Sequence, residues 1–295
     1  MHNDFVKYLT TGEEDSEWGL FINVTGSVKI PPNETYPSLN HPSEYFFNWM
    51  EGRVLKEFQI NYITEGKGIL ENEHGSFNLN TGSVFVTFPG LWHRYKPLAK
   101  TGWKENYVGF DGFIARKLIA PSFFKPESPV FHLGIKEELI DTYLKIFDIV
   151  EKEQPGFQQI ASGMVLKLLG YIVSLEKQKG FSGKKIARVI ESIRFEIRQN
   201  LEKELDFNKM AKKYNVSYSY FRKMFKKYTG VSPGQYHMQL KLMRAKELLV
   251  STDKSIKEIS YELGFQSIYY FSNMFKKKEG LTPSHFRNKN GPINR

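Results

Sequence analysis

The sequence FRKMFKKYTGVSPGQY at residues 221–236 returns fifty residues later as FSNMFKKKEGLTPSHF at residues 271–286, with seven identities in sixteen positions. A repeat of this quality at one constant offset indicates a structural unit that occurs twice. In both copies the spacing Phe-x-x-Met-Phe is helical, a glycine follows, and Ser-Pro or Thr-Pro comes next. Each copy therefore predicts the end of one helix and the capped start of another.

A shorter amphipathic segment precedes each copy, at about residues 206–214 and 255–263. Asn215 and Gly264 follow these segments, and both residue types tolerate the left-handed backbone that a tight turn requires. A short helix, a tight turn and a second helix make a helix-turn-helix unit, so the repeat predicts two such units. The second helix of such a unit is the one that enters the major groove of DNA.

Large apolar side chains indicate which face of each second helix is buried. In the helix expected at about 218–228, Phe221, Met224 and Phe225 form one stripe, and the helix expected at about 267–278 repeats it. The opposite faces carry polar side chains that point outward: Ser219, Arg222, Lys223, Tyr269, Ser272 and Asn273. Arginine and lysine can donate to guanine, and asparagine can pair with adenine, so these faces have the chemistry to read base edges.

Charge separates the two halves of the chain. The net charge is +10, but residues 182–295 alone carry +14 and the first 181 residues carry −4. Segregation of this kind favours contact between the C-terminal half and nucleic acid. Four lysines late in the two second helices are better placed for phosphates than for bases: Lys226, Lys227, Lys276 and Lys277. The alternative is that these lysines are solvated and only interact with the helix dipoles.

Residues 185–290 resemble the DNA-binding part of the AraC/XylS family of bacterial transcription regulators. The likeness rests on short motifs in the right order: Met210-Ala211, Ser217 to Phe221, Phe225-Lys226-Lys227, Gly230, Arg244-Ala245, Leu248-Leu249, Ile259, Gly264-Phe265, Tyr270-Phe271, Phe275-Lys276-Lys277, Gly280 and Thr282-Pro283. Ser260 departs from the family, where a small alanine is usual. The resemblance implies that the six outward polar residues contact bases, and that a central helix at about 233–250 holds both units on double-stranded DNA. It also implies contact with RNA polymerase and activation of transcription.

The first half of the chain has a different period. From Arg53 to Phe110, short runs alternate apolar and polar residues between glycine turns, which predicts a small antiparallel β-barrel or sandwich. Helical spacing begins after Gly134, and a second helix is expected at about 157–179. One stripe of that helix is a candidate dimer contact, unless it packs on the barrel instead: Ile160, Met164, Leu168 and Ile172.

Residues 15–170 resemble, less closely, the cupin-like ligand-binding domain of arabinose-type regulators. The likeness lies in residues 62–68, 82–95, Trp103 and 110–112. It implies a barrel that binds a small molecule, often a sugar, with an N-terminal arm over it and a homodimer through the following helices. Aromatic rings suit the apolar faces of sugars, and the candidate effector contacts are Trp18, Tyr62, Trp92, His93, Arg94, Tyr95 and Trp103. The alternative for rings such as Tyr62 is that they fill the barrel core.

Other classes of protein lack their residues here. The chain has no cysteine, which excludes disulfides, Cys-ligated metals and thiol nucleophiles. His93 matches the last histidine of a metal-binding cupin motif, but only His74 lies where the first half of that motif would be, so we expect no metal and no cofactor. Signatures of hydrolases, nucleotide-binding enzymes and zinc peptidases are absent, and we expect no enzyme activity. A constitutive architectural DNA-binding protein would not need the separate β domain.

The sequence thus predicts an α+β multidomain protein. Residues 1–180 are expected to form a cupin-like β-barrel with dimerisation helices, and residues 184–291 an all-α domain with two helix-turn-helix motifs. No signal peptide and no unbroken run of about 18 apolar residues is seen, so a cytoplasmic location without membrane contact is expected. The expected function is effector-responsive, sequence-specific regulation of transcription, with a carbohydrate or related metabolite as effector.

Overall fold

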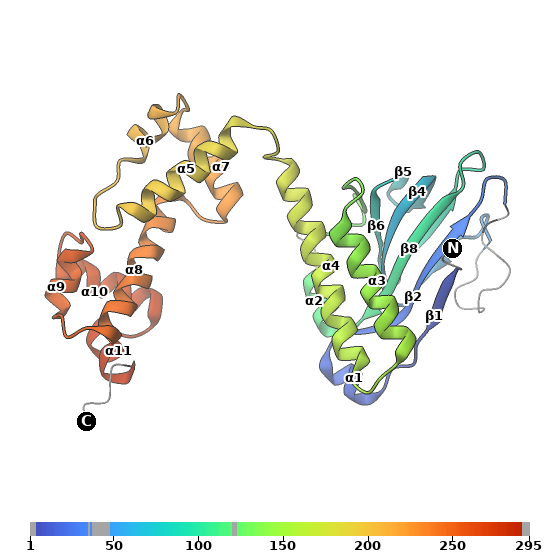
Figure 1. Cartoon of the computed structure of the whole chain (residues 1–295), viewed down its shortest axis with the longest axis horizontal. Coiled ribbons are helices and arrows are strands. Elements are labelled where there is room, and N and C mark those ends of the chain that lie inside the picture. The colour runs from blue at the N-terminus through green and yellow to red at the C-terminus, as the bar shows by residue number, and fades with distance from the viewer. Residues whose placement is uncertain (1–3, 35, 37–47, 120–122, 291–295) are drawn as a thin grey trace. The chain divides into compact units, whose positions relative to one another are not determined.

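A computed structural model describes residues 4–34, 36, 48–119 and 123–290 of the chain. The chain divides into two compact units, Met1–Lys179 and Gly180–Arg295. Among the described residues, the first unit contains the strands and four helices, and the second contains helices alone (Figure 1). This arrangement confirms the predicted fold class, a β domain with helices followed by a domain of helices.

The first unit is built on antiparallel strands in the order β1-β2-β8-β4-β6-β9, with β5 and β7 also paired to β4 and β3 paired to β7. Their bounds are β1 Phe5–Tyr8, β2 Phe21–Ile30, β3 Arg53–Val54, β4 Phe58–Asn72, β5 Gly75–Asn80, β6 Ser83–Thr87, β7 Trp92–Pro97, β8 Trp103–Asp111 and β9 Val130–His132. The start of β4 pairs with β6 and β8, and its end pairs with β5 and β7. A bulge between Ile63 and Glu65 interrupts the pairing of β4 with β8, just before the residues of β4 that pair with β5 and β7.

The first half of strand β4, residues 58–63, has both of its faces buried. Phe58, Ile60 and Tyr62 belong to the core that faces the helices, whereas Gln59 and Asn61 alternate with them and point into the barrel. The sequence pattern predicted the alternation, but the polar positions are as buried as the apolar ones. The barrel interior is therefore partly polar, because the remaining strands close around it.

Four helices belong to the first unit: α1 Glu13–Trp18, α2 Phe113–Ile119, α3 Glu137–Lys152 and α4 Phe157–Lys179. Helices α3 and α4 lie side by side along one face of the sheet (Figure 1). By length and composition α4 could cross a membrane, but Leu168 and Ile172 are fully buried in the core of this unit. These two residues of the expected dimer stripe are thus unavailable to a second copy, while Ile160 is 55% exposed and Met164 half-buried.

The second unit has seven helices in its described part: α5 Lys185–Gln199, α6 Phe207–Lys213, α7 Tyr218–Thr229, α8 Pro233–Ser251, α9 Ile256–Glu262, α10 Ile268–Glu279 and α11 Pro283–Asn290. The helices predicted from the repeat start and end within two residues of these bounds. Ser232 and Gln235 form a capping box at the start of α8, directly before Pro233. Asn215 and Gly264 both have the predicted positive φ, at 55° and 63°.

We expect Gly264→Ala to destabilise the second unit more than Gly280→Ala, although both glycines have positive φ. A Cβ at Gly264 would lie 1.6 Å from the Glu202 carbonyl oxygen, whereas nothing lies within 4 Å of one at Gly280. Left-handed backbone alone costs an alanine about 1–2 kcal/mol, and the clash adds to that at Gly264 only. Urea unfolding of both full-length variants measures the difference. Equal losses of stability would contradict the close approach.

Candidate DNA-reading helices and effector pocket

Serine caps and paired phenylalanines fix the rotation of α7 and α10. Ser217 Oγ accepts a hydrogen bond from the Tyr220 backbone N–H, and Ser267 does the same at the start of α10. In α7 the rings of Phe221 and Phe225 are fully buried with centroids 5.4 Å apart. The equivalent rings of α10 are also fully buried, at 5.8 Å. The opposite face of each helix must therefore point outward.

The structure places the proposed base contacts on these outward faces. Five of the six are exposed, namely Ser219, Arg222, Lys223, Tyr269 and Asn273, while Ser272 is half-buried. Tyr269, near the start of α10, is 77% exposed. The four proposed phosphate contacts are exposed, and none of them forms an ion pair with the part of the chain that the structure describes: Lys226, Lys227, Lys276 and Lys277. Free ammonium groups of this kind can neutralise phosphates.

Further tyrosines lie at the starts of α7 and α10, the two candidate reading helices. Tyr218, Tyr220 and Tyr270 are between 37% and 47% exposed. The sequence reasoning named only Tyr269, yet the repeat aligns Tyr220 with Tyr270, and that symmetry was the available signal. Tyrosine hydroxyls can donate to phosphate oxygens, so these residues extend the polar edge that each helix presents.

Polar side chains gather inside the barrel of the first unit. They come from strands β4, β6, β7 and β8, and all are buried: Asn61, Thr87, His93, Tyr95, Trp103 and Glu105. Five of their atoms have no hydrogen-bond partner among the described residues, namely Asn61 Oδ1 and Nδ2, Thr87 Oγ1, Trp103 Nε1 and Glu105 Oε2. A buried polar atom without a partner costs about 1–3 kcal/mol, and such groups are normally satisfied by a ligand or ordered water. The concentration of these atoms identifies the barrel interior as the candidate effector site.

Burial keeps most of these groups neutral. It lowers the pKa of His93 to about 3, and the nearby Arg53 guanidinium adds to that effect. It raises the pKa of Glu105 to about 8, although Arg53 acts in the opposite direction. Arg53 also donates hydrogen bonds to Tyr95 Oη and to His93 Nε2. At pH 7 the site therefore presents an uncharged imidazole, a protonated carboxyl and phenol hydroxyls beside one guanidinium.

The barrel brings together three of the seven proposed effector contacts, His93, Tyr95 and Trp103. Trp92 and Arg94 alternate with His93 and Tyr95 along β7 and point away from the interior. The Arg94 guanidinium instead pairs with Glu71, 2.6 Å away. Four consecutive strand residues cannot all face one side, so of residues 92–95 only His93 and Tyr95 face the barrel interior.

The remaining two proposed contacts lie on the helix side of the sheet. Tyr62 is fully buried there, where its hydroxyl donates to the Gly134 carbonyl and accepts from the Lys136 backbone N–H. Trp18 is 54% exposed on α1, and its indole N–H donates to Ser162 Oγ of α4. The alternative interpretation, that Tyr62 is a core residue, describes its position. Asn61, Thr87 and Glu105 were missed because a polar residue within a strand normally indicates an exposed face.

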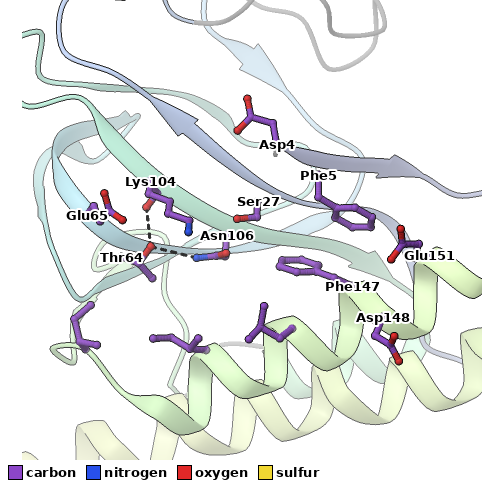
Figure 2. Close-up of a pocket in the computed structure, with 13 residues that line it drawn as sticks. Asp4, Phe5, Ser27, Thr64, Glu65, Lys104, Asn106, Phe147, Asp148 and Glu151 are labelled. Atoms are coloured by element: carbon purple, nitrogen blue, oxygen red, sulfur yellow. Dashed lines mark hydrogen bonds between the residues drawn. The ribbon is translucent and has the colours of Figure 1, made fainter. Parts of the chain in front are cut away.

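A cavity of about 730 Å³ lies outside the barrel, between the sheet and α3 (Figure 2). The rings of Phe5 and Phe147 approach each other across it, and Asn106 donates to Thr64 at one end. Lys104 and four carboxylates line the same space, and none of the seven proposed effector contacts does. Walls of both charges favour no single class of ligand. Within residues 4–34, 36, 48–119 and 123–290, no group of three or more His, Asp or Glu side chains could hold a metal ion.

Comparisons with known proteins match both units. A model of helix-turn-helix domains matches residues 210–289, and a model of AraC-like ligand-binding domains matches residues 37–177. The Msm operon regulatory protein of Streptococcus mutans is 28% identical over 79% of this chain and 85% of its own length. The lactose operon transcription activator of Staphylococcus xylosus is 24% identical over the same shares. The C-terminal domain of AraT, a response regulator from Geobacillus stearothermophilus, is 28% identical over 38% of this chain and 93% of that domain, with a TM-score of 0.35.

Replacing Arg222 or Asn273 by alanine is expected to reduce discrimination between DNA sites by about 1–3 kcal/mol for each lost bidentate base contact. Replacing Lys226 or Lys277 by alanine is expected to weaken binding to all duplexes and to flatten its salt dependence, because only a phosphate contact is lost. Titration of each variant with specific and random duplexes at several salt concentrations separates the two effects. Equal losses on both duplexes for Arg222→Ala would refute its assignment to a base.

Glu105→Gln is expected to remove part of the pH dependence of stability. The folded protein holds the Glu105 proton up to about pH 8, whereas the unfolded chain releases it near 4.5. The stability contributed by this carboxyl is therefore complete below about pH 4.5 and is lost as pH rises to about 8, by up to about 1.4 kcal/mol per pH unit. Urea unfolding of wild type and variant at pH 5, 6.5 and 8 tests this. A difference between them that stays constant with pH would show that Glu105 ionises normally.

Proposed function

The chain belongs to the AraC family of transcription regulators, and from this premise we propose that it is an effector-responsive activator that senses a carbohydrate or a related polyhydroxylated metabolite. The family carries an AraC-like ligand-binding domain and a helix-turn-helix DNA-binding domain, and it is a family of regulators rather than enzymes. The observation that carries the proposal is a set of five polar atoms inside the barrel that have no hydrogen-bond partner among the described residues.

The chemistry of these atoms favours hydroxyl groups as their partners. Asn61 Oδ1 needs a donor, whereas Asn61 Nδ2 and Trp103 Nε1 need acceptors. A hydroxyl can donate and accept at once, so one polyol satisfies both kinds of group. The buried rings of Tyr95 and Trp103 lie beside them, with centroids 6.0 Å apart, and offer apolar surface for the C–H faces of a sugar. The name of the lactose operon activator among the relatives agrees with this class of effector.

Effector binding would act by shifting an equilibrium between states that differ in DNA affinity. In this proposal α7 and α10 read a promoter in double-stranded DNA, in the cytoplasm, and the bound regulator contacts RNA polymerase. A homodimer would form through the exposed part of α4 around Ile160 and Met164, because Leu168 and Ile172 are core residues. In this proposal the arm is the N-terminal segment that contains strand β1, which pairs with β2, and Trp18.

A thermal-shift screen of the full-length protein against sugars, polyols and small metabolites tests the proposal. We expect a stabilising ligand whose affinity falls about five- to tenfold in Thr87→Val, since that change removes one unpartnered hydroxyl of the barrel and costs about 1 kcal/mol of binding. Thr64→Val is the matched control, because Thr64 lies outside the barrel interior. The same ligand should change the affinity for duplexes selected by the protein. A ligand that binds Thr87→Val as well as wild type would place the site elsewhere.

A further inference from the structure

The two helix-turn-helix units do not share a hydrophobic core. Among the described residues, one cluster packs α5, α6 and α7, and a separate cluster packs α9 and α10. Helix α8 contributes to both, with Tyr236 and Leu240 in the first cluster and Leu242 and Ala245 in the second. Apolar contacts therefore attach each unit to α8, but they do not by themselves join one unit to the other.

A buried lysine on α8 contacts the turn of the second helix-turn-helix unit, between α9 and α10. Lys241 is 6% exposed, and its Nζ donates to the Gly264 carbonyl oxygen at 3.2 Å. The same ammonium lies 5.3 Å from the centre of the Phe265 ring. Burial lowers the pKa of Lys241, and the carboxylates of Glu202 and Glu204 oppose that shift. A buried cation is retained only where specific partners hold it, and here they come from both units.

The same place joins the backbones of the two units. The loop after α5 brings the Glu202 carbonyl so close to Gly264 that no Cβ fits between them. On the other side of that loop, His237 of α8 is hydrogen-bonded through Nε2 to the Leu201 carbonyl oxygen, at 3.0 Å. Thus α8 contacts the loop that leads into the first helix-turn-helix unit through His237. It contacts the turn of the second helix-turn-helix unit through Lys241. Hydrogen bonds are directional, so contacts of this kind define an orientation that apolar packing leaves loose.

We propose that Lys241 is a positioning residue that fixes the orientation of α10 relative to α7. It thereby sets the spacing that the protein accepts between the two DNA segments contacted by α7 and α10 of one chain. One base pair of added spacing turns one of these DNA segments by about 35° around the DNA axis relative to the other. The range of spacings that the protein tolerates therefore depends on how firmly α7 and α10 are held. The consequence for DNA rests on the proposed reading role of α7 and α10, whereas the orientation itself does not.

The orientation can be measured without DNA. The chain has no cysteine, so Lys226→Cys with Lys276→Cys places one spin label at equivalent exposed positions of α7 and α10. We expect double electron–electron resonance to give one narrow distance distribution in the otherwise unchanged protein and a broader or shifted one with Lys241→Met. Lys241→Arg should restore the narrow distribution, because a guanidinium can donate to the same carbonyl. Arg244→Met is the control, since the ion pair that Arg244 forms within the described part of the chain is with Glu247 of its own helix.

The consequence for DNA is read by selection from random duplexes with the full-length protein. The wild-type protein should lose about tenfold in affinity when the selected spacing between the α7 and α10 segments of the DNA changes by one base pair. The Lys241→Met variant should lose less than about threefold. Unchanged distance distributions in a folded Lys241→Met variant would overturn the proposal. So would an affinity loss that is the same at every spacing, because that would make Lys241 an ordinary contributor to stability. If Lys241→Met fails to fold, a broad distribution with the folded Lys241→Arg variant overturns it. Altered distances without any selected duplex would instead count against the DNA-reading role.

Discussion

The covering of both faces of β4 along residues 58–63 is the constraint on which the first unit depends. One face joins the apolar core beneath α3 and α4, and the other closes a barrel whose interior carries Asn61 and its polar neighbours. A strand with one solvated face would satisfy those polar groups with water. Because the barrel closes, their hydrogen-bonding capacity is kept for whatever enters it. The candidate effector site and the apolar core therefore lie on opposite faces of the same strand.

Electrostatics inside the barrel and on the reading helices follow opposite rules. Burial suppresses charge in the barrel, where His93 stays neutral and Glu105 holds its proton near pH 7. Exposure preserves charge on α7 and α10, whose lysines have no ion-pair partner in the described part of the chain. A neutral interior suits discrimination by hydrogen bonds, and a cationic surface suits a polyanion. The net charges of −4 and +14 for the two halves of the sequence are the outward sign of this division.

In the second unit, a tandem repeat produces two helix-turn-helix units with separate hydrophobic cores. Each helix-turn-helix unit buries its own phenylalanine pair, so each could adopt its fold without fixing the other. The contacts around Lys241 and Gly264 connect them through polar groups and a backbone approach that only glycine allows. Apolar burial is thus divided between two cores, while these polar and backbone contacts link the two helix-turn-helix units at one place.

The sequence by itself determined the parts that depend on local periodicity and capping. The repeat located α6 to α10 and the outward faces of α7 and α10, because Phe221, Phe225 and their counterparts leave one helical rotation that buries them. It could not assign the effector contacts, since a period of two says which strand residues share a face but not what covers that face. Tyr62 and Asn61 are neighbours in sequence, and only the closed barrel decided that one is core and the other lines the site. The contact of Lys241 with Gly264 also belongs to tertiary structure alone, because no local rule joins a helix residue to a turn residue 23 positions away.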